Sequence, residues 1–504
     1  MKKFVLFLLL ILFIPGVFAQ TYDVDLTATM LRNNGVWKKG TQVDIKKLVH
    51  KTYVDGLGAY KETFYLQDDL GNMEEIPLNV NDRFEFKIDN IQQFWDINII
   101  TNVISRLKNK GFQYDLRAEM EEDALEYIDE IRNRELEFND PNLESYIYSL
   151  VAKIAPIQLI DGRPGSVNLL IQNNPTLNAG CFPNGTIVLN TGLLASLHSE
   201  DELVAILAHE IAHFILDHSV QNVNAAISRQ KRSEFWAGLA TALTAIAEGY
   251  VASRNVYYVP GAATIAMAAM STKIASEVVD YLGMNYNHYQ ESEADNLAVE
   301  TLRILGYNEN ALATALSRIE GEYIKERNNA MYINSYTHPA LLERISNVGT
   351  VQDLKDEKFE KIISFAVSSV AMMKYSDCRF RQCFPLIEQN ITNGVATSDD
   401  YTLKANCLLC TKNDDVSNKE VLSLIEKAKM LDPDNLNIYK TEIIATLRLE
   451  DKTKAVELLN LYKKRLEDYS LENVNNDSVW ANLNRFLVSE LDWTNKMIVK
   501  LKAM

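Results

Sequence analysis

The pattern of hydrophobic and polar positions first predicts strands. Between residues 20 and 92, runs rich in β-forming residues, such as ETFYL (62–66) and RFEFK (83–87), alternate with turn signals at DGLG (55–58) and DLGN (69–72). We therefore expect a small β module, either a barrel or a sheet, over residues 20–92.

From about residue 93 the hydrophobic period becomes helical. Residues 120–136 form a charged amphipathic pattern, and residues 143–154 carry an apolar stripe with helical spacing. Residues 351–504 are helical again and contain few glycines. The pattern thus predicts an α+β protein that is mainly helical.

The C-terminal segment contains an internal repeat. VLSLI (421–425) aligns with AVELL (455–459) at an offset of 34 residues, and LDPDN (431–435) leads into the next helix. A helix pair repeated every 34 residues is the tetratricopeptide period. We predict tetratricopeptide-like helical hairpins within residues 351–504, with a generic helical bundle as the alternative.

The first residues have the features of an export signal. Lys2 and Lys3 precede an apolar run over residues 4–14, and small residues up to Ala19 offer a cleavage position. This run is shorter than the roughly 20 residues that span a bilayer. We interpret residues 1–19 as a signal peptide and expect an exported chain, in the periplasm, with a retained anchor as the alternative.

Composition limits the classes of partner. The 504 residues suggest about three domains. Acidic residues outnumber basic ones, 68 to 51, which gives a net charge of −17 and argues against nucleic acid as a partner. Hydrophobic residues make up 47 % of the chain, enough for a sizeable core.

Export changes the interpretation of the five cysteines. In an oxidising compartment, Cys378 and Cys383, together with Cys407 and Cys410, are expected to form disulfides of undetermined pairing. A structural zinc site made by these four residues is the alternative. Cys181 lies far from them along the chain and is expected to be a buried free thiol.

The sequence HEIAH (209–213) carries the candidate chemistry. Ser199 and Glu202 form a capping-box pattern, which predicts a helix over residues 200–218. Residues four apart share a helix face, so His209 and His213 can bind one Zn²⁺. Glu210 lies beside them and can take a proton from zinc-bound water. Two buried structural histidines are the alternative.

A catalytic zinc needs a third protein ligand. ESEAD (291–295) lies on a predicted amphipathic helix, where Glu291 and Asp295 share a face. One carboxylate can reach the metal while the other accepts a hydrogen bond from a ligating histidine. A solvated acidic helix face is the alternative.

These motifs together resemble a known family. The chain resembles the zinc metalloendopeptidases that include the CAAX prenyl protease and HtpX, in particular their periplasmic branch, typified by the β-barrel assembly-enhancing protease. The resemblance covers about residues 140–350. The matching motifs are NAGCFPNG (178–185) followed by TIVLNTGLL (186–194), HEIAH (209–213), ESEAD (291–295), and THP (337–339) with Arg344-Ile345.

The resemblance implies a gluzincin-like zinc peptidase domain with a small edge sheet and one Zn²⁺ per chain. His209, His213 and Glu291 would bind the metal, and Glu210 would be the general base. Asp295 would orient a ligand or donate a proton. His338 would stabilise the oxyanion or occupy the fourth coordination position.

The resemblance also implies where substrate binds. An extended peptide would add to the edge of a sheet along residues 186–190. These substrate-binding residues would be Thr186, Ile187, Val188, Leu189 and Asn190.

The sequence departs from the family at Asn287-His288, where the family often has Ser-Arg. His288 could replace some contacts of that arginine or lie on the surface. Arg344 is expected to form a structural ion pair. His218 is nine residues beyond His209, about 180° around a continuous helix, so we reject it as a ligand.

A long apolar stretch separates the two zinc motifs. Residues 235–277 contain uncharged runs interrupted by a few charges, and neither run is a convincing membrane span. We expect helices that are buried or cover the cleft, with contact to a membrane surface or a true span as alternatives.

The sequence therefore predicts a signal peptide (1–19), a β module (20–92), a zinc metallopeptidase domain with leading helices (93–350) and a helical repeat domain (351–504). The expected function is hydrolysis of peptide bonds in protein or peptide substrates, in envelope protein quality control, with envelope partners bound by the repeats. The alternative is a repeat-based chaperone or scaffold with little or no proteolysis.

Overall fold

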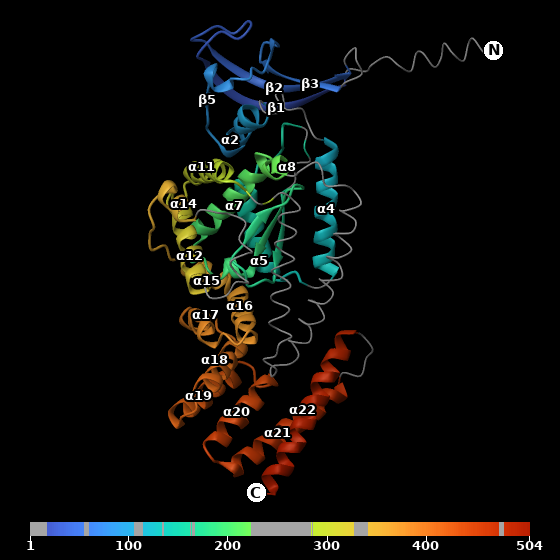
Figure 1. Ribbon diagram of the computed structural model, residues 1–504, viewed down its shortest axis with the longest axis vertical. Helices are drawn as coiled ribbons and strands as arrows, with labels where there is room; N and C mark the ends of the chain where they lie inside the picture. Colours follow the sequence, from blue (N-terminus) through green and yellow to red (C-terminus); the bar gives the residue numbers. More distant parts are fainter. Residues whose placement is uncertain are drawn as a thin grey trace, which may run out of the picture.

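The protein is elongated, with a β module at one end and a series of helices at the other (Figure 1). The computed structural model describes residues 18–54, 60–104, 114–133, 136–161, 163, 167–222, 284, 286–326, 341–472 and 478–503. The candidate chemistry lies in the middle part, between these two ends (Figure 1).

The N-terminal part is a five-stranded antiparallel sheet in the order β4-β3-β2-β1-β5, which confirms the predicted β module. Along β1, Val24, Leu26, Ala28 and Met30 are buried, as expected when alternate side chains face one core. The strands are β1 (Phe18–Met30), β2 (Gln42–Val54), β3 (Tyr60–Asp68), β4 (Met73–Glu75) and β5 (Phe84–Lys87).

Helix α2 (Ile91–Asn98), continued by a π-helix (Ile99–Ile104), joins the β module to the middle part. The Trp95 indole donates a hydrogen bond to the carbonyl of Ile154 at 2.6 Å. Gln93 donates to the carbonyl of Asp25 at 2.7 Å. The helix is thus tied to β1 on one side and to α5 on the other.

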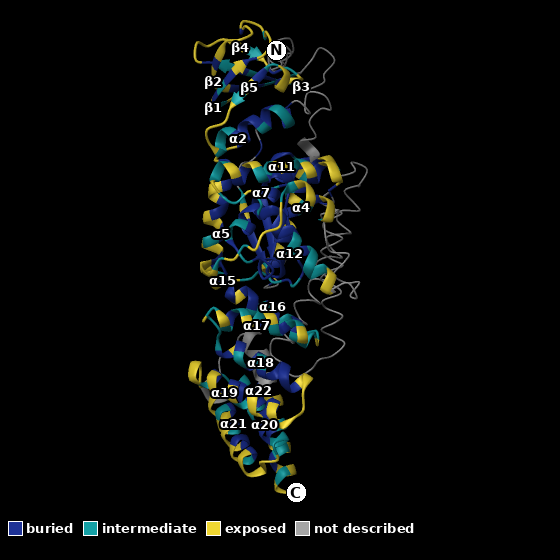
Figure 2. Ribbon diagram, turned by 90° about the vertical axis from the view of Figure 1, so that its left-hand side faces the viewer, coloured by how far each residue is buried: buried dark blue, intermediate teal, exposed yellow. Residues whose placement is uncertain are grey.

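The middle part surrounds helix α7 (Glu200–Ile215), which is buried along almost its whole length (Figure 2). A helix that is apolar on all sides is typical of the centre of a domain. Neighbouring elements that pack against α7 are α5 (Pro141–Ile154), α8 (His218–Asn222), α11 (His288–Leu305), α12 (Ala311–Glu326), β7 (Ala179–Cys181) and β8 (Thr186–Asn190). Further elements are α4 (Tyr114–Asn133), β6 (Asn168–Gln172), α6 (Thr191–Leu194) and α14 (Leu341–Val348).

The start of α7 follows the predicted capping pattern only in part. The Ser199 side chain accepts a hydrogen bond from the Glu202 amide at 3.3 Å. The Glu202 carboxylate does not return the bond to Ser199; it accepts from the His198 amide at 2.6 Å and pairs with Arg318. Glu202 therefore joins α7 to α12 as well as closing the first turn.

The end of α7 comes earlier than the predicted residue 218. Asp217 adopts a left-handed conformation (φ 63°), which terminates the helix. Arg163 donates to the carbonyls of Phe214 and Ile215 at 2.7 Å each and pairs with the buried Asp161 at 2.7 Å. These interactions satisfy carbonyl groups that the helix leaves without an internal partner.

The C-terminal part is helical, as predicted. Its first helices belong to the core of the middle part, because Phe359, Ile363 and Val367 lie in the same hydrophobic cluster as α7. Helices α18 to α22 each pack against the next along the chain. The helices are α15 (Glu357–Ile362), α16 (Ser364–Ser376), α17 (Phe380–Thr392), α18 (Ser398–Thr411), α19 (Asp415–Leu431), α20 (Asn437–Arg448), α21 (Lys452–Glu472) and α22 (Ser478–Lys502).

The disulfide prediction was wrong for this structure, in which all five cysteines are free. Cys383 and Cys407 are buried in one apolar cluster, where a thiol packs as a small hydrophobic group. The Cys383 thiol lies 3.3 Å from the carbonyl of Ala371, which it can reach as a donor. Cys378 and Cys410 are exposed, and Cys181 is a buried free thiol as expected.

None of the helices in the described part of the chain has the length and apolarity needed to cross a bilayer. The predicted apolar segment 235–277 lies outside the described residues.

Asp96, buried in α2 at the junction, makes stability depend on pH. Burial raises its pKa to about 7, although the hydrogen bond from Gln92, at 2.8 Å, lowers it. In the unfolded chain the pKa of Asp is about 3.9. As the pH rises from about 4 to 7, the unfolded chain loses this proton while the folded protein keeps it, so folding becomes less favourable. The loss amounts to about 1.4 kcal/mol for each unit of pKa difference.

We therefore expect Asp96→Asn to be more stable than wild type at pH 8, by a few kcal/mol, and equally stable near pH 4. Urea unfolding measured at several pH values checks this. The exposed Asp89→Asn is the matched control and should shift stability by a constant amount. If the difference in stability between Asp96→Asn and wild type were also the same at every pH, the raised pKa of Asp96 would be contradicted.

Candidate metal centre

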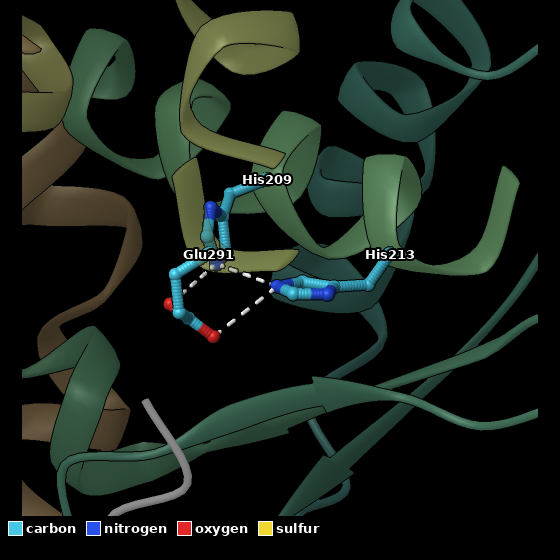
Figure 3. Close-up of side chains that lie close together, drawn as sticks. All are labelled: His209, His213 and Glu291. Carbon is cyan, nitrogen blue, oxygen red and sulfur yellow. Dashed lines mark hydrogen bonds and ion pairs between the residues drawn. The ribbon is translucent and has the colours of Figure 1, made fainter. Parts of the chain in front are cut away.

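Two helices bring three metal-binding side chains together. His209 and His213 project from one face of α7, and Glu291 projects from the first turn of α11 (Figure 3). All three side chains are buried, and their nearest ligand atoms lie within 4.8 Å of one another. Among the residues that the structure describes, this is the only such cluster of metal-binding side chains.

The spacing of the donor atoms fits a tetrahedral ion. The two Nε2 atoms of His209 and His213 are 3.0 Å apart, and each lies 3.6 Å from an oxygen of Glu291. A tetrahedral zinc with ligand distances of about 2.0–2.1 Å separates its donors by roughly 3.3–3.4 Å. The donor set of two imidazoles and one carboxylate is that of catalytic zinc sites, which keep a fourth position for water.

The start of α11 fixes Glu291 at the centre. The Asn287 side chain caps the helix by accepting from the amides of Tyr289 and Gln290, and the Gln290 side chain accepts from the Asn287 amide. Gln290 also donates to the side chain of Asn222 in α8 at 3.0 Å. Glu291 therefore lies on a helix end that is held against α8.

Asp295 lies one turn beyond Glu291 and contacts the other side of the His209 ring. Its Oδ1 is 2.9 Å from His209 Nδ1. Burial raises the pKa of Asp295, but the hydrogen bond from His209 and the ion pair with Arg344 outweigh burial and lower the pKa to about 2. Asp295 is therefore ionised and fixes the ring so that Nε2 faces the cluster.

Arg344, from α14, forms the expected ion pair, but it does so inside the candidate site. It contacts both oxygens of Asp295, at 2.8 and 2.7 Å, and lies 2.5 Å from Glu291 Oε2. The guanidinium thus holds the two carboxylates of α11 together. The sequence predicted an ion pair but did not identify its partners.

Glu210 is buried beside the cluster, next to strand β7. Burial chiefly, and the charge of Glu210 in addition, raise the pKa of the Cys181 thiol and of the Tyr286 hydroxyl. Both groups are therefore neutral near neutral pH. Glu210 thus lies near Cys181 of β7 and near Tyr286.

The sequence analysis rejected His218 as a ligand but did not predict that it contacts the ligand His213. Because α7 ends at Ile215 and Asp217 is left-handed, the chain turns and places His218 Nδ1 2.8 Å from His213 Nδ1. His218 Nε2 lies 3.4 Å from Glu293 Oε2. His218 is not among the three clustered ligands, as expected, but it is the neighbour of one of them. The available signal was Asp217 itself, because aspartate is one of the residue types that adopt a left-handed conformation and so can end a helix.

The strand predicted over residues 186–190 is present, but the prediction that it lies at the edge of the sheet was wrong. Strand β8 (Thr186–Asn190) is the central strand of the sheet, whose order is β6-β8-β7, and all five of its residues are buried. It pairs with β6 on one side and β7 on the other, so its backbone is already hydrogen-bonded. The edge strand next to α7 is β7 (Ala179–Cys181).

Two other predicted residues are His288 and His338. His288 is exposed, with its Nδ1 3.9 Å from Glu343 Oε2, as expected for a surface histidine. His338 lies outside the described residues.

Comparisons with known proteins agree with this geometry. Residues 141–351 match the model of peptidase family M48. The chain is 27 % identical over 197 residues to a putative β-barrel assembly-enhancing protease of Vibrio cholerae, covering 39 % of this chain and 37 % of that protein. It is 26 % identical over 196 residues to the β-barrel assembly-enhancing protease of Escherichia coli K12, covering 38 % and 36 %.

A shorter match, 36 % identical over 58 residues, links the chain to the mitochondrial metalloendopeptidase OMA1 of Arabidopsis thaliana, covering 12 % of each protein. The chain spans a little over a third of the length of the curated bacterial relatives it matches. The family model includes both helices of the metal cluster. Over residues 141–351 the chain is therefore similar to peptidase family M48.

Proposed function

We propose that this protein is a zinc-dependent endopeptidase. The observation that carries the proposal is the convergence of His209, His213 and Glu291 in one buried cluster, with Glu210 beside it. The similarity to family M48 supports a metalloprotease, and the donor set supports zinc.

His209, His213 and Glu291 would hold the metal. When bound, zinc supplies Lewis acidity and lowers the pKa of water. Glu210 would remove the proton from the attacking water and return it to the leaving amine. Asp295 would keep the His209 ring oriented. The oxyanion or fourth-ligand role of His338 stays a sequence-based prediction.

Substrate would bind along strand β7 (Ala179–Cys181). This strand lies at the edge of the three-stranded sheet and packs against α7. An extended peptide added to such an edge gains backbone hydrogen bonds that tolerate many sequences. The peptide would also run past Glu210, whose charge contributes to the raised pKa of Cys181 in this strand.

The cellular setting is inferred from the whole chain. Residues 1–19 have the features of a signal peptide, so the protein would be exported to the periplasm. Helices α18 to α22, which we propose to be tetratricopeptide-like hairpins, would recruit envelope proteins as substrates or partners. Likeness to β-barrel assembly-enhancing proteases supports a role in envelope protein quality control.

Substitution of the general base tests the proposal. We expect Glu210→Gln to lower kcat for cleavage of an unfolded test protein by about 10²–10⁴-fold, because proton transfer is lost. Zinc content should stay at one ion per chain, because the three ligands are intact.

The matched control is Glu300→Gln, an exposed carboxylate on α11, which should cleave like wild type. Unchanged cleavage by Glu210→Gln would contradict the enzyme assignment. Unchanged biological activity of that variant would instead favour a chaperone or scaffold whose C-terminal helices carry the function.

Asp295 gives a second test, with metal affinity as the readout. We expect Asp295→Asn to weaken zinc binding by about 10- to 100-fold, because the amide lacks the charge that orients His209. Competition with a chromophoric chelator measures this, with Glu300→Gln again as the control. Wild-type affinity in Asp295→Asn would refute the orienting role.

A further inference from the structure

The second histidine ligand has its own supporting chain, formed by residues that the proposed mechanism does not use. His213 Nδ1 lies 2.8 Å from His218 Nδ1, and His218 Nε2 lies 3.4 Å from Glu293 Oε2. The two histidines are buried, and Glu293 lies on α11 two residues after Glu291.

The metal cluster fixes the direction of the hydrogen bond between the two histidines. His213 presents Nε2 to His209 and Glu291, so a neutral His213 ring carries its proton on Nδ1. That proton is donated to His218 Nδ1, which must then be the acceptor. His218 consequently carries its own proton on Nε2 and directs it to Glu293.

From this geometry we infer that His218, backed by Glu293, is a positioning residue for the metal ligand His213. The inference rests on the proposed zinc site. Glu293 makes His218 a better acceptor, and His218 fixes both the tautomer and the orientation of the His213 ring. Asp295 does the same for His209, so each imidazole ligand has a different partner on its Nδ1 side.

Several interactions hold His218 in place. The left-handed residue Asp217 changes the direction of the chain after α7. Arg117 pairs with the Asp217 side chain. Gln290, the residue before Glu291, approaches the carbonyl of His218 at 3.5 Å. The turn is thus anchored from α4 and from α11.

The His213 ring is also restrained from the side. Tyr286 stacks on it with ring centroids 3.7 Å apart and an interplanar angle of 14°. The Tyr286 hydroxyl lies 3.0 Å from the hydroxyl of Ser219, the residue after His218. Stacking limits tilting of the ring but leaves rotation in its own plane, which the hydrogen bond to His218 controls.

The test compares zinc affinities, measured by chelator competition, for wild type and four variants. We expect His218→Leu to bind zinc about 10- to 100-fold more weakly, because the acceptor for His213 is lost. His218→Asn places an amide oxygen near the position of Nδ1, so it should restore affinity to within about three-fold of wild type. Glu293→Gln should weaken binding less than His218→Leu, and the exposed His288→Leu should not change it.

Visible spectra of the Co²⁺-loaded proteins separate positioning from mere folding. His218→Leu should change the ligand-field bands, and His218→Asn and His288→Leu should keep those of wild type. Wild-type affinity and spectrum in His218→Leu would overturn the inference, as would equal losses in His218→Leu and His218→Asn.

If His218→Leu does not fold, the zinc affinity of Glu293→Gln tests the inference instead. A several-fold loss of zinc affinity in this variant would support the inference, and wild-type affinity would overturn it. Absence of zinc binding by the wild-type protein would refute the proposed function and this inference together. Normal binding by wild type and by all variants would refute the inference alone.

Discussion

The structure depends on how buried charge is balanced around the candidate metal centre. Glu210, Glu291 and Asp295 are all buried there, and Arg344 pairs with Glu291 and Asp295. Burying uncompensated carboxylates in an apolar core is costly. A divalent cation between His209, His213 and Glu291 would supply further positive charge to these carboxylates.

This balance explains why two separate helices must be placed so accurately. Helix α7 supplies the histidines and Glu210, and α11 supplies Glu291 and Asp295, so a bound cation would link the two helices. The surrounding contacts also hold the two helices in place. Arg163 caps the C-terminus of α7, Asn287 caps the N-terminus of α11, and Gln290 joins α11 to α8. The apolar core then holds both helices in this register.

Much of the architecture could be predicted because it depends on local sequence. The β module, the mainly helical remainder and the positions of α7 and α11 follow from hydrophobic period and capping residues. The three clustered side chains could be named because HEIAH and ESEAD each place their members on one helix face. The meeting of those two helices came from the resemblance to a family.

The features that were missed depend on tertiary contacts. The end of α7 and the turn at Asp217 are stabilised by Arg163 and Arg117, which are distant in sequence, and only this turn brings His218 to His213. Similarly, the pattern of residues 186–190 predicts a strand but not its neighbours, so its central position in the sheet was hidden. For the cysteines, the expected oxidising compartment suggested disulfides, but all five thiols are free, and two of them, Cys383 and Cys407, are buried in one apolar cluster.

Zinc-edge anomalous diffraction from crystals of the zinc-loaded protein tests the central claim most directly. The account predicts one strong peak at about 2.0–2.2 Å from the Nε2 atoms of His209 and His213 and from a carboxylate oxygen of Glu291. A zinc peak elsewhere, or a Glu291 side chain turned away from the two imidazoles, would contradict it.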